Sequence, residues 1–315
     1  MWTISFAVIK LSLITLLGFF LYKRRIITED ILKFLTFFVI SISIPALIFS
    51  HLIENSRAVL NAPLNIFIIL SVGIFFAGYS LGFIFSFRGN FEFKREFISL
   101  TSFQNAGYLP MNIAFFLFPA AIRDRFLVYI FLYLIGFNVI MWSIGSFFIF
   151  KKKGDKFQFK SLMTPPVVST VVSLLLIYTG ISKFVPLMLI EPVRMVGDVS
   201  FVFSMIVLGC WLSKVKFEGV SKSLRFVAQA SIVKLIILPT LFLIGLLYFK
   251  EVSLLGVFII LQAAMPSAAS LPIVVNFREA NSGFVSQGVF VTHLFSIVTI
   301  PIWLGIYLKL SNFSF

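Results

Sequence analysis

Apolar residues dominate the chain in ten long runs that are separated by short polar connections. A helix of about 20 residues covers the roughly 30 Å hydrocarbon core of a bilayer, and apolar runs of this length favour membrane-spanning helices. We therefore predict an all-α polytopic membrane protein. Its ten expected transmembrane helices cover residues 3–22, 31–52, 63–86, 97–119, 126–150, 164–182, 190–213, 226–249, 253–277 and 284–308.

The ninth run contains an interruption that a continuous helix tolerates poorly. Gln262–Pro272 carries two prolines and several small polar side chains, and each proline removes a backbone donor and clashes one turn back. We expect the chain to unwind between Met265 and Pro272, where irregular backbone must be buried or line a cavity. Because the fourth run repeats this chemistry in Gln104–Asn112, the sequence predicts two broken helices, which are typical of transport sites.

Two broken helices that cross near the middle of the membrane would point the free N–H groups of their second halves at one place. Such a place favours an anion, and neighbouring amides and hydroxyls add neutral hydrogen bonds. The alternative is that these polar groups only satisfy backbone atoms that the prolines expose. The candidate substrate-binding residues are Gln104, Asn105, Gly107, Pro110, Gln262, Met265, Pro266, Ser267, Ser270 and Pro272.

Composition agrees with a membrane setting and excludes several classes of site. The chain is 60% apolar and 12% charged, with a mean hydropathy of +1.07, which is incompatible with a solvated surface. The net charge of +14 is spread over separate loops rather than one patch, so we expect no nucleic-acid partner. Cys210 is the single cysteine, which rules out an internal disulfide and a cysteine metal cluster. We predict no metal site and no cofactor.

Basic residues are concentrated in the odd-numbered connections, most clearly at Lys23–Arg25 and Lys151–Lys160. The positive-inside rule then places the odd-numbered loops in the cytoplasm and both termini outside. We expect an integral protein of the plasma (inner) membrane, with the lipid bilayer as its first partner.

Ten spans divide into two halves of five, residues 1–155 and 156–315, with no soluble domain. The second half would enter the membrane from the opposite side, which is the arrangement of an inverted repeat. Two short matches recur at nearly the same offset. They are Leu109–Pro110 with Leu271–Pro272, and Phe38–Ser41 with Phe201–Ser204.

Four ionisable residues inside the runs are candidates for ion or proton coupling or for charge balance, because charge is costly in a bilayer. Lys10 either balances an anion or extends its side chain to the membrane interface. Lys234 lies too deep to reach the interface, so it needs a partner or a cavity. Asp198 is a proton or cation site, or the partner of Arg194 one turn away. His293 either couples protons or is a hydrogen-bonded core histidine.

Five stretches, in this order, resemble a known family. They are Ile42–Phe49, Asn105–Tyr108, Gly197–Gly209, Ala263–Ala268 and Ser296–Pro301. Together they are similar to the auxin efflux carrier family of membrane transporters, which includes plant auxin carriers and bacterial malonate-type permeases.

The resemblance implies two inverted five-helix repeats, a scaffold domain, a transport domain with crossing broken helices four and nine, and movement of organic anions. The family's Gly-Asn-x-Gly pattern falls on Gln104–Gly107, with Gln104 in place of the usual glycine. Its Met-Pro pattern falls on Met265–Pro266. The family's span-four proline is expected two residues beyond Pro110, where this chain has Asn112.

The leading hypothesis is a secondary active transporter or facilitative carrier of a small organic anion, such as a dicarboxylate or an auxin-like acid, working by alternating access. The chain lacks a Gly-x-x-x-x-Gly-Lys-Ser/Thr sequence, so it carries no ATP-binding loop of that type. The coupling ion, a proton or sodium, is left open. A homodimer is a candidate assembly.

Other function classes fit the sequence less well. A cation/proton antiporter or sodium-coupled symporter on a related scaffold is the main alternative, although only Asp198 lies well inside a run. A membrane enzyme or a sensor ranks lower. His51 and His293 are the only histidines, and the paired acids that would hold a metal-bound pyrophosphate are missing. We expect no enzyme.

Overall fold

All regular elements described in the computed structural model are helices, and the model describes residues 2–86, 93–141, 145–150, 163–215, 220–277 and 280–313. Among these residues the only β-type pairing is an isolated antiparallel bridge between Gln104 and Ser267. The α-helices are α1 (Trp2–Lys23), α2 (Glu29–Phe38), α3 (Ile44–Glu54), α4 (Ser56–Asn61), α5 (Leu64–Ser86), α6 (Lys94–Ser102), α7 (Tyr108–Leu117), α8 (Ala120–Val139), α9 (Gly145–Phe150), α10 (Pro165–Tyr178), α11 (Leu187–Ser213), α12 (Val220–Ile232), α13 (Leu238–Tyr248), α14 (Leu254–Ala264), α15 (Leu271–Phe277) and α16 (Ser282–Ser311).

Six helical runs in the described residues are long and apolar enough to cross a membrane. They are Thr3–Lys23, Glu29–Glu54, Leu64–Ser86, Leu187–Ser213, Leu224–Tyr248 and Ser282–Ser311. Three shorter apolar helices, α7, α10 and α14, add to them. The prediction of an all-α membrane protein is therefore confirmed. Helices also occupy each of the ten predicted ranges, while ten crossings and an inverted repeat stay predictions.

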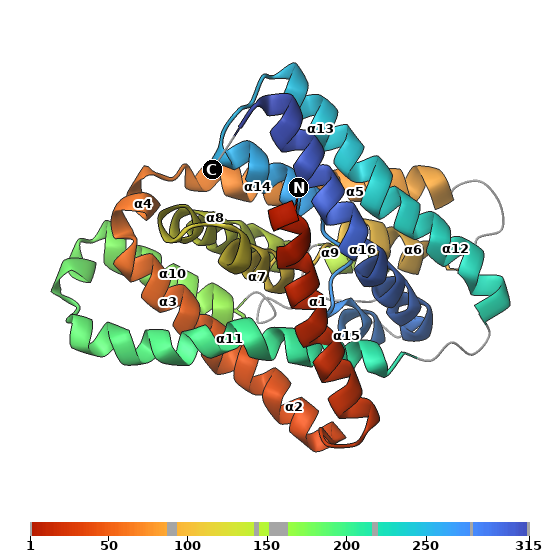
Figure 1. Cartoon of the computed structure of the whole chain (residues 1–315), viewed down its shortest axis with the longest axis horizontal. Coiled ribbons are helices and arrows are strands. Elements are labelled where there is room, and N and C mark those ends of the chain that lie inside the picture. The colour runs from red at the N-terminus through yellow and green to blue at the C-terminus, as the bar shows by residue number, and fades with distance from the viewer. Residues whose placement is uncertain are drawn as a thin grey trace.

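The helices pack in two groups, each of which contains helices from both halves of the chain (Figure 1). In the first group, α11 packs along α1 and against α3, and α10 packs against α3. In the second, α5 packs against α6 and α8, and α16 packs against α12, α14 and α15. Helix α1 also contacts α7 and α16, so it joins the two groups.

Two of the long helical runs are widened by a π-helical turn just before a proline. Val39–Ser43 forms such a turn ahead of Pro45, and Val233–Ile237 forms one ahead of Pro239. A proline clashes with the carbonyl group one turn back and leaves it without a donor, and a wider turn relieves this strain without ending the helix. Lys234 lies in the second of these turns.

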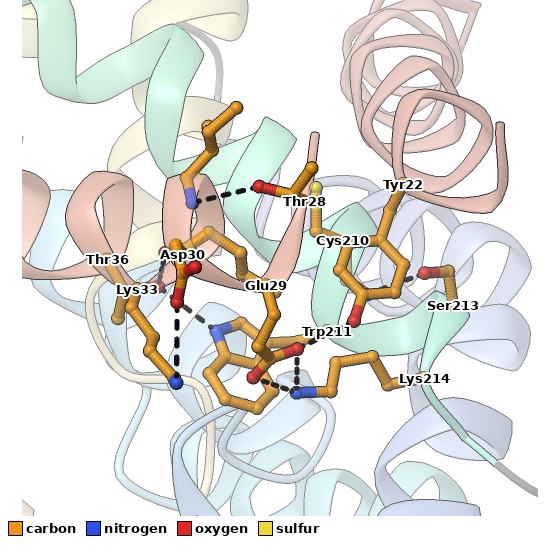
Figure 2. Close-up of polar contacts among 12 residues, drawn as sticks. Tyr22, Thr28, Glu29, Asp30, Lys33, Thr36, Cys210, Trp211, Ser213 and Lys214 are labelled. Carbon is orange, nitrogen blue, oxygen red and sulfur yellow. Dashed lines mark hydrogen bonds and ion pairs between the residues drawn. The ribbon is translucent and has the colours of Figure 1, made fainter. Parts of the chain in front are cut away.

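The ends of α1 and α11 are joined to the start of α2 by a polar cluster (Figure 2). The Lys214 ammonium lies 2.8 Å and 2.9 Å from the two carboxylate oxygens of Glu29. The Tyr22 hydroxyl donates to the same carboxylate at 2.7 Å, and the Lys214 ammonium lies 4.5 Å from the centre of the Trp211 ring. This cluster holds the α1–α2 connection against the end of α11.

Candidate functional site

Two helical runs are interrupted where the sequence contains prolines and small polar residues. The first run is unwound between the end of α6 at Ser102 and the start of α7 at Tyr108, and the second between Ala264 and Leu271. Pro266 lies in the second unwound segment, whereas Pro272 is the second residue of α15. Because proline is well tolerated in the first turn of a helix, Pro272 is part of α15 rather than of the break. The break is therefore shorter than the Met265–Pro272 segment we expected.

Backbone hydrogen bonds join the two unwound segments in an antiparallel arrangement. The Asn105 N–H donates to the Pro266 carbonyl at 2.8 Å, and the Ala268 N–H donates to the Phe103 carbonyl at 3.0 Å. Gln104 and Ser267 face each other between these bonds. The crossing thus supplies partners to backbone groups that have left their helices, as irregular backbone in a membrane requires.

Candidate side chains add further bonds at the crossing. The Gln262 amide donates to the Ala106 carbonyl at 3.1 Å, and the Ser267 hydroxyl donates to the Leu100 carbonyl at 2.7 Å. The Gln104 amide donates to the Tyr133 hydroxyl. These candidates and Met265 are fully buried, so they hold the two segments together.

A cavity of about 440 Å³ adjoins the crossing, and we call it the central cavity. Gln104–Tyr108 and Ala268–Ser270 form one side of it. The end of α8, the start of α10 and residues of α3 and the turn before it form the rest. No charged side chain lines the central cavity among the described residues. Of the candidates, Gln104, Asn105, Gly107 and Ser270 line it directly.

The amino-terminal end of α7 lies at the edge of the central cavity. Gly107 caps this helix without a side-chain hydrogen bond, and Gly107 and Tyr108 both line the cavity. The first N–H groups of a helix lack partners within the helix. Pro110, the third residue of α7, has no N–H to offer. The end of α7 therefore presents a small set of donors, with the positive end of the helix dipole behind them.

The structure brings His293 to Asn105, a contact between residues far apart in sequence. The Asn105 amide nitrogen lies 3.1 Å from His293 Nε2. On the other side of the ring, Nδ1 lies 2.8 Å from the Val289 carbonyl. His293 is 6% exposed and Asn105 is 3% exposed, so both hydrogen bonds are shielded from solvent.

Lys234 is fully buried, and its partner is a backbone carbonyl rather than an acid. Its ammonium donates to the Thr101 carbonyl at 3.1 Å. Thr101 lies in the last turn of α6, immediately before the unwound segment. Carbonyl groups at the end of a helix lack partners within the helix and carry a partial negative charge that favours a cation.

The other two ionisable candidates lie away from the crossing. Lys10 is exposed, with its ammonium 5.8 Å from the centre of the Phe116 ring. Asp198 is exposed and lines a separate cavity of about 150 Å³. Within the described residues, Arg194 pairs with Glu54 at 3.2 Å rather than with Asp198. Of the two alternatives left open for Asp198, the pairing with Arg194 is not the one formed, because packing of α3 against α11 brings a different carboxylate to Arg194.

Residues that the sequence reasoning did not select also contribute to the site. Tyr133 accepts from Gln104, the Thr292 hydroxyl accepts from the Ser267 N–H at 3.3 Å, and Asn138 lines the central cavity. Asn138 carries a signal that could have been noticed, an amide within an apolar run. Asn112, where the family places a proline, continues α7 and donates to the Ser204 hydroxyl at 3.1 Å.

Comparison with protein families gives a match over most of the sequence. A family model described as membrane transport protein matches residues 3–161 and 154–304. No match was found among curated proteins. The family match agrees with the all-helical membrane fold and with the stretches that resemble auxin efflux carriers. The chain belongs to the membrane transport protein family of auxin efflux carriers, and it is a transporter rather than an enzyme.

Proposed function

We propose that this protein is a secondary transporter of small organic anions and that the anion binds in the central cavity beside the crossing. The single observation that carries the proposal is the paired, unwound crossing beside a cavity of about 440 Å³. Ligand cavities of about 300–1,000 Å³ suit small molecules. Unwound helices that line such a cavity are the usual location of a transport site.

The polarity of the cavity favours an anion held by dipoles and neutral donors. Since no described charged side chain lines it, a bound carboxylate would receive N–H groups from the start of α7, together with the amide of Asn105 and the hydroxyl of Ser270. Lys234 does not line the cavity but bonds to the Thr101 carbonyl just before the first unwound segment, so it adds a positive charge without direct contact. Weak, multiple contacts of this kind let a substrate leave as well as bind.

The lining of the central cavity supports alternating access, because part of it lies next to a predicted cytoplasmic connection. Met163–Pro166, at the start of α10, line the cavity. This segment directly follows the predicted cytoplasmic connection Lys151–Lys160. We assign the conformation as inward-facing, in a protein of the plasma (inner) membrane with both termini outside.

The same proposal covers the architecture. Residues 1–155 and 156–315 form two inverted five-helix repeats, supported by the similar places of Pro110 in α7 and Pro272 in α15. The group containing α1, α3, α10 and α11 serves as the scaffold domain, and the second helical group serves as the transport domain. The assembly is a homodimer, and cross-linking in membranes tests it.

Transport in proteoliposomes tests the function. Labelled malonate and labelled indole-3-acetate represent a dicarboxylate and an aryl monocarboxylate. We expect uptake of at least one, and we expect Asn105→Ala and Pro266→Ala to reduce it strongly. Asn61→Ala and Pro63→Ala are the matched controls, since both residues are exposed, Asn61 at the end of α4 and Pro63 in the connection after it. An absence of flux for a panel of organic anions, or flux indifferent to both site variants, would overturn the proposal.

The same assay separates the main alternative. A cation/proton antiporter or sodium symporter would show a flux that changes when sodium is replaced with choline. Asp198→Asn would remove this dependence. Asp198 and Asn112 line the cavity of about 150 Å³, so any cation dependence is expected there rather than at the crossing.

A further inference from the structure

We infer that His293 and Asn105 form a proton-operated switch that makes the central cavity bind an anion only together with a proton. The inference rests on the proposed function and adds the coupling ion to it. It concerns a contact between two buried side chains, one of which lines the central cavity.

The hydrogen-bond partners of the ring correspond to one protonation state. Nδ1 faces the Val289 carbonyl at 2.8 Å, and a carbonyl only accepts, so Nδ1 carries the hydrogen. Nε2 faces the amide nitrogen of Asn105 at 3.1 Å, and an amide nitrogen only donates, so Nε2 accepts. We therefore assign His293 as neutral, with its hydrogen on Nδ1.

This neutral state sets what Asn105 offers to a ligand. One N–H of the Asn105 amide is directed at His293, which leaves the amide oxygen on the side turned away from the ring. Asn105 lines the central cavity, and the N–H that the ring engages is not available to a carboxylate there. The neutral state is thus a poor anion site.

Protonation reverses this arrangement without moving the backbone. When a proton enters through the central cavity and binds Nε2, an N–H bond forms and Nε2 must donate. The Asn105 amide then turns over about its last bond, so that its oxygen accepts from Nε2, and its NH₂ group turns away from the ring. Because amide oxygen and nitrogen occupy nearly the same positions after such a turn, the switch fits within the existing packing.

Burial makes the proton and the anion depend on each other. The ring lines a side cavity of about 220 Å³ that is mostly apolar, with Leu11 and Thr15 of α1 and Leu208 of α11 among its walls. A charge in such surroundings is costly unless an opposite charge lies nearby. A carboxylate in the central cavity provides one, so each ligand strengthens the binding of the other by the same factor.

Other titratable groups are not placed to replace His293 in this role. The elements that pack against α16 carry Lys10, Tyr22 and Lys23 on α1, Lys94, Arg95 and Glu96 on α6, Glu191, Arg194, Asp198 and Cys210 on α11, Arg225 on α12, Tyr248 on α13 and Lys234 in the π-turn before α13. None of these lines the side cavity. In the described residues the ring forms hydrogen bonds with the Asn105 amide and the Val289 carbonyl.

The test compares substitutions of the two histidines in the chain. Purified protein is reconstituted, and the KM for whichever acid is transported, malonate or indole-3-acetate, is measured from pH 5.5 to 7.5. A pH-sensitive dye inside the vesicles reports proton uptake. For the wild type we expect the KM to fall by up to about tenfold for each unit of decreasing pH, as one linked proton requires, with proton uptake accompanying the anion. For His293→Gln we expect transport without proton uptake, and a KM that changes less than about twofold between pH 5.5 and 7.5. His51→Gln, the matched buried control, is expected to behave as the wild type.

A measurement on the resting protein keeps the inference testable apart from transport. Nitrogen-15 NMR of histidine-labelled protein at neutral pH should show one ring with hydrogen on Nδ1 that disappears in His293→Gln. Hydrogen on Nε2 instead, or an unchanged pH dependence and proton flux in a folded His293→Gln protein, would overturn the switch. If the wild type moves no organic anion but the Nδ1 tautomer is found, the proposed function fails and the assignment of the ring stands.

Discussion

The ammonium of Lys234 donates to the carbonyl oxygen of Thr101 across 3.1 Å, at the point where α6 ends and the crossing begins. No ion pair with an acid is formed by Lys234 in the described part of the chain. The lysine therefore uses the negative end of a helix as its counter-charge. Its own positive charge is directed toward the start of the unwound segment that lines the central cavity.

Lys234→Met tests whether this charge serves the substrate. We expect the KM for the transported anion to rise about tenfold, corresponding to the loss of about 1.4 kcal/mol of favourable charge interaction. We expect the protein still to fold, because replacing a buried charge by an apolar side chain removes a desolvation cost. Lys250→Met is the control, since Lys250 is exposed in the connection after α13. Unchanged transport per folded molecule in Lys234→Met would show that the charge serves only the fold.

Cysteine labelling distinguishes the two serines of the second unwound segment. Ser270 is half-buried and lines the central cavity, whereas Ser267 is fully buried and bonded to the Leu100 carbonyl. We expect a small thiol reagent to label Ser270→Cys and the transported anion to slow that labelling, while Ser267→Cys stays unlabelled. The native Cys210 is fully buried, so its background should be low. Equal labelling of both variants would contradict the described cavity.

The helical runs and their interruptions could be predicted because they depend on local sequence. Apolar length predicts the helices, and prolines with small polar residues predict where two of them break. The precise extent of a break is less local. Pro272 lies in the first turn of α15, because the Ala268 N–H bonds to the Phe103 carbonyl and fixes the chain up to that point. Spacing alone does not reveal this.

Partners of the ionisable residues could not be predicted, because they come from other helices. Lys234 bonds to a carbonyl of α6, and His293 meets Asn105 across the crossing. A carbonyl carries no sequence signal, since every residue has one. The spacing of Arg194 and Asp198 suggested a pair on one helix, but the packing of α3 and α11 gave Arg194 the carboxylate of Glu54.

The cluster around Glu29 predicts a small but measurable coupling between α2 and α11. The side chains of Lys214 and Glu29 are 29% and 43% exposed, and pairs with this exposure contribute about 0.2–1 kcal/mol. A double-mutant cycle with Glu29→Gln and Lys214→Gln, measured by denaturant unfolding, should give a coupling in this range that decreases in high salt. The pair Asp30–Lys33, with side chains 95% and 66% exposed, should give no measurable coupling. A Glu29–Lys214 coupling well above 2 kcal/mol would contradict the expected screening.

The seam between α1 and α11 depends on glycine, and Gly209→Ala should disrupt it. A Cβ atom at Gly209 would lie 1.9 Å from the Thr15 carbonyl oxygen. The neighbouring Cys210 thiol lies 3.2 Å from the Gly18 carbonyl, so the two backbones are in close contact along this seam.

Since a backbone atom cannot turn aside as a side chain does, the helices must separate, and overpacking of this kind costs about 1–3 kcal/mol. The control is Gly245→Ala in α13, where a Cβ atom meets nothing within 4 Å. That change should raise the free energy of unfolding by about 0.5–1 kcal/mol, because alanine is the better helix former. The midpoints of thermal and denaturant unfolding, measured in detergent, should therefore fall for Gly209→Ala and rise for Gly245→Ala. Stabilisation by both substitutions would mean that α1 and α11 do not meet at Gly209.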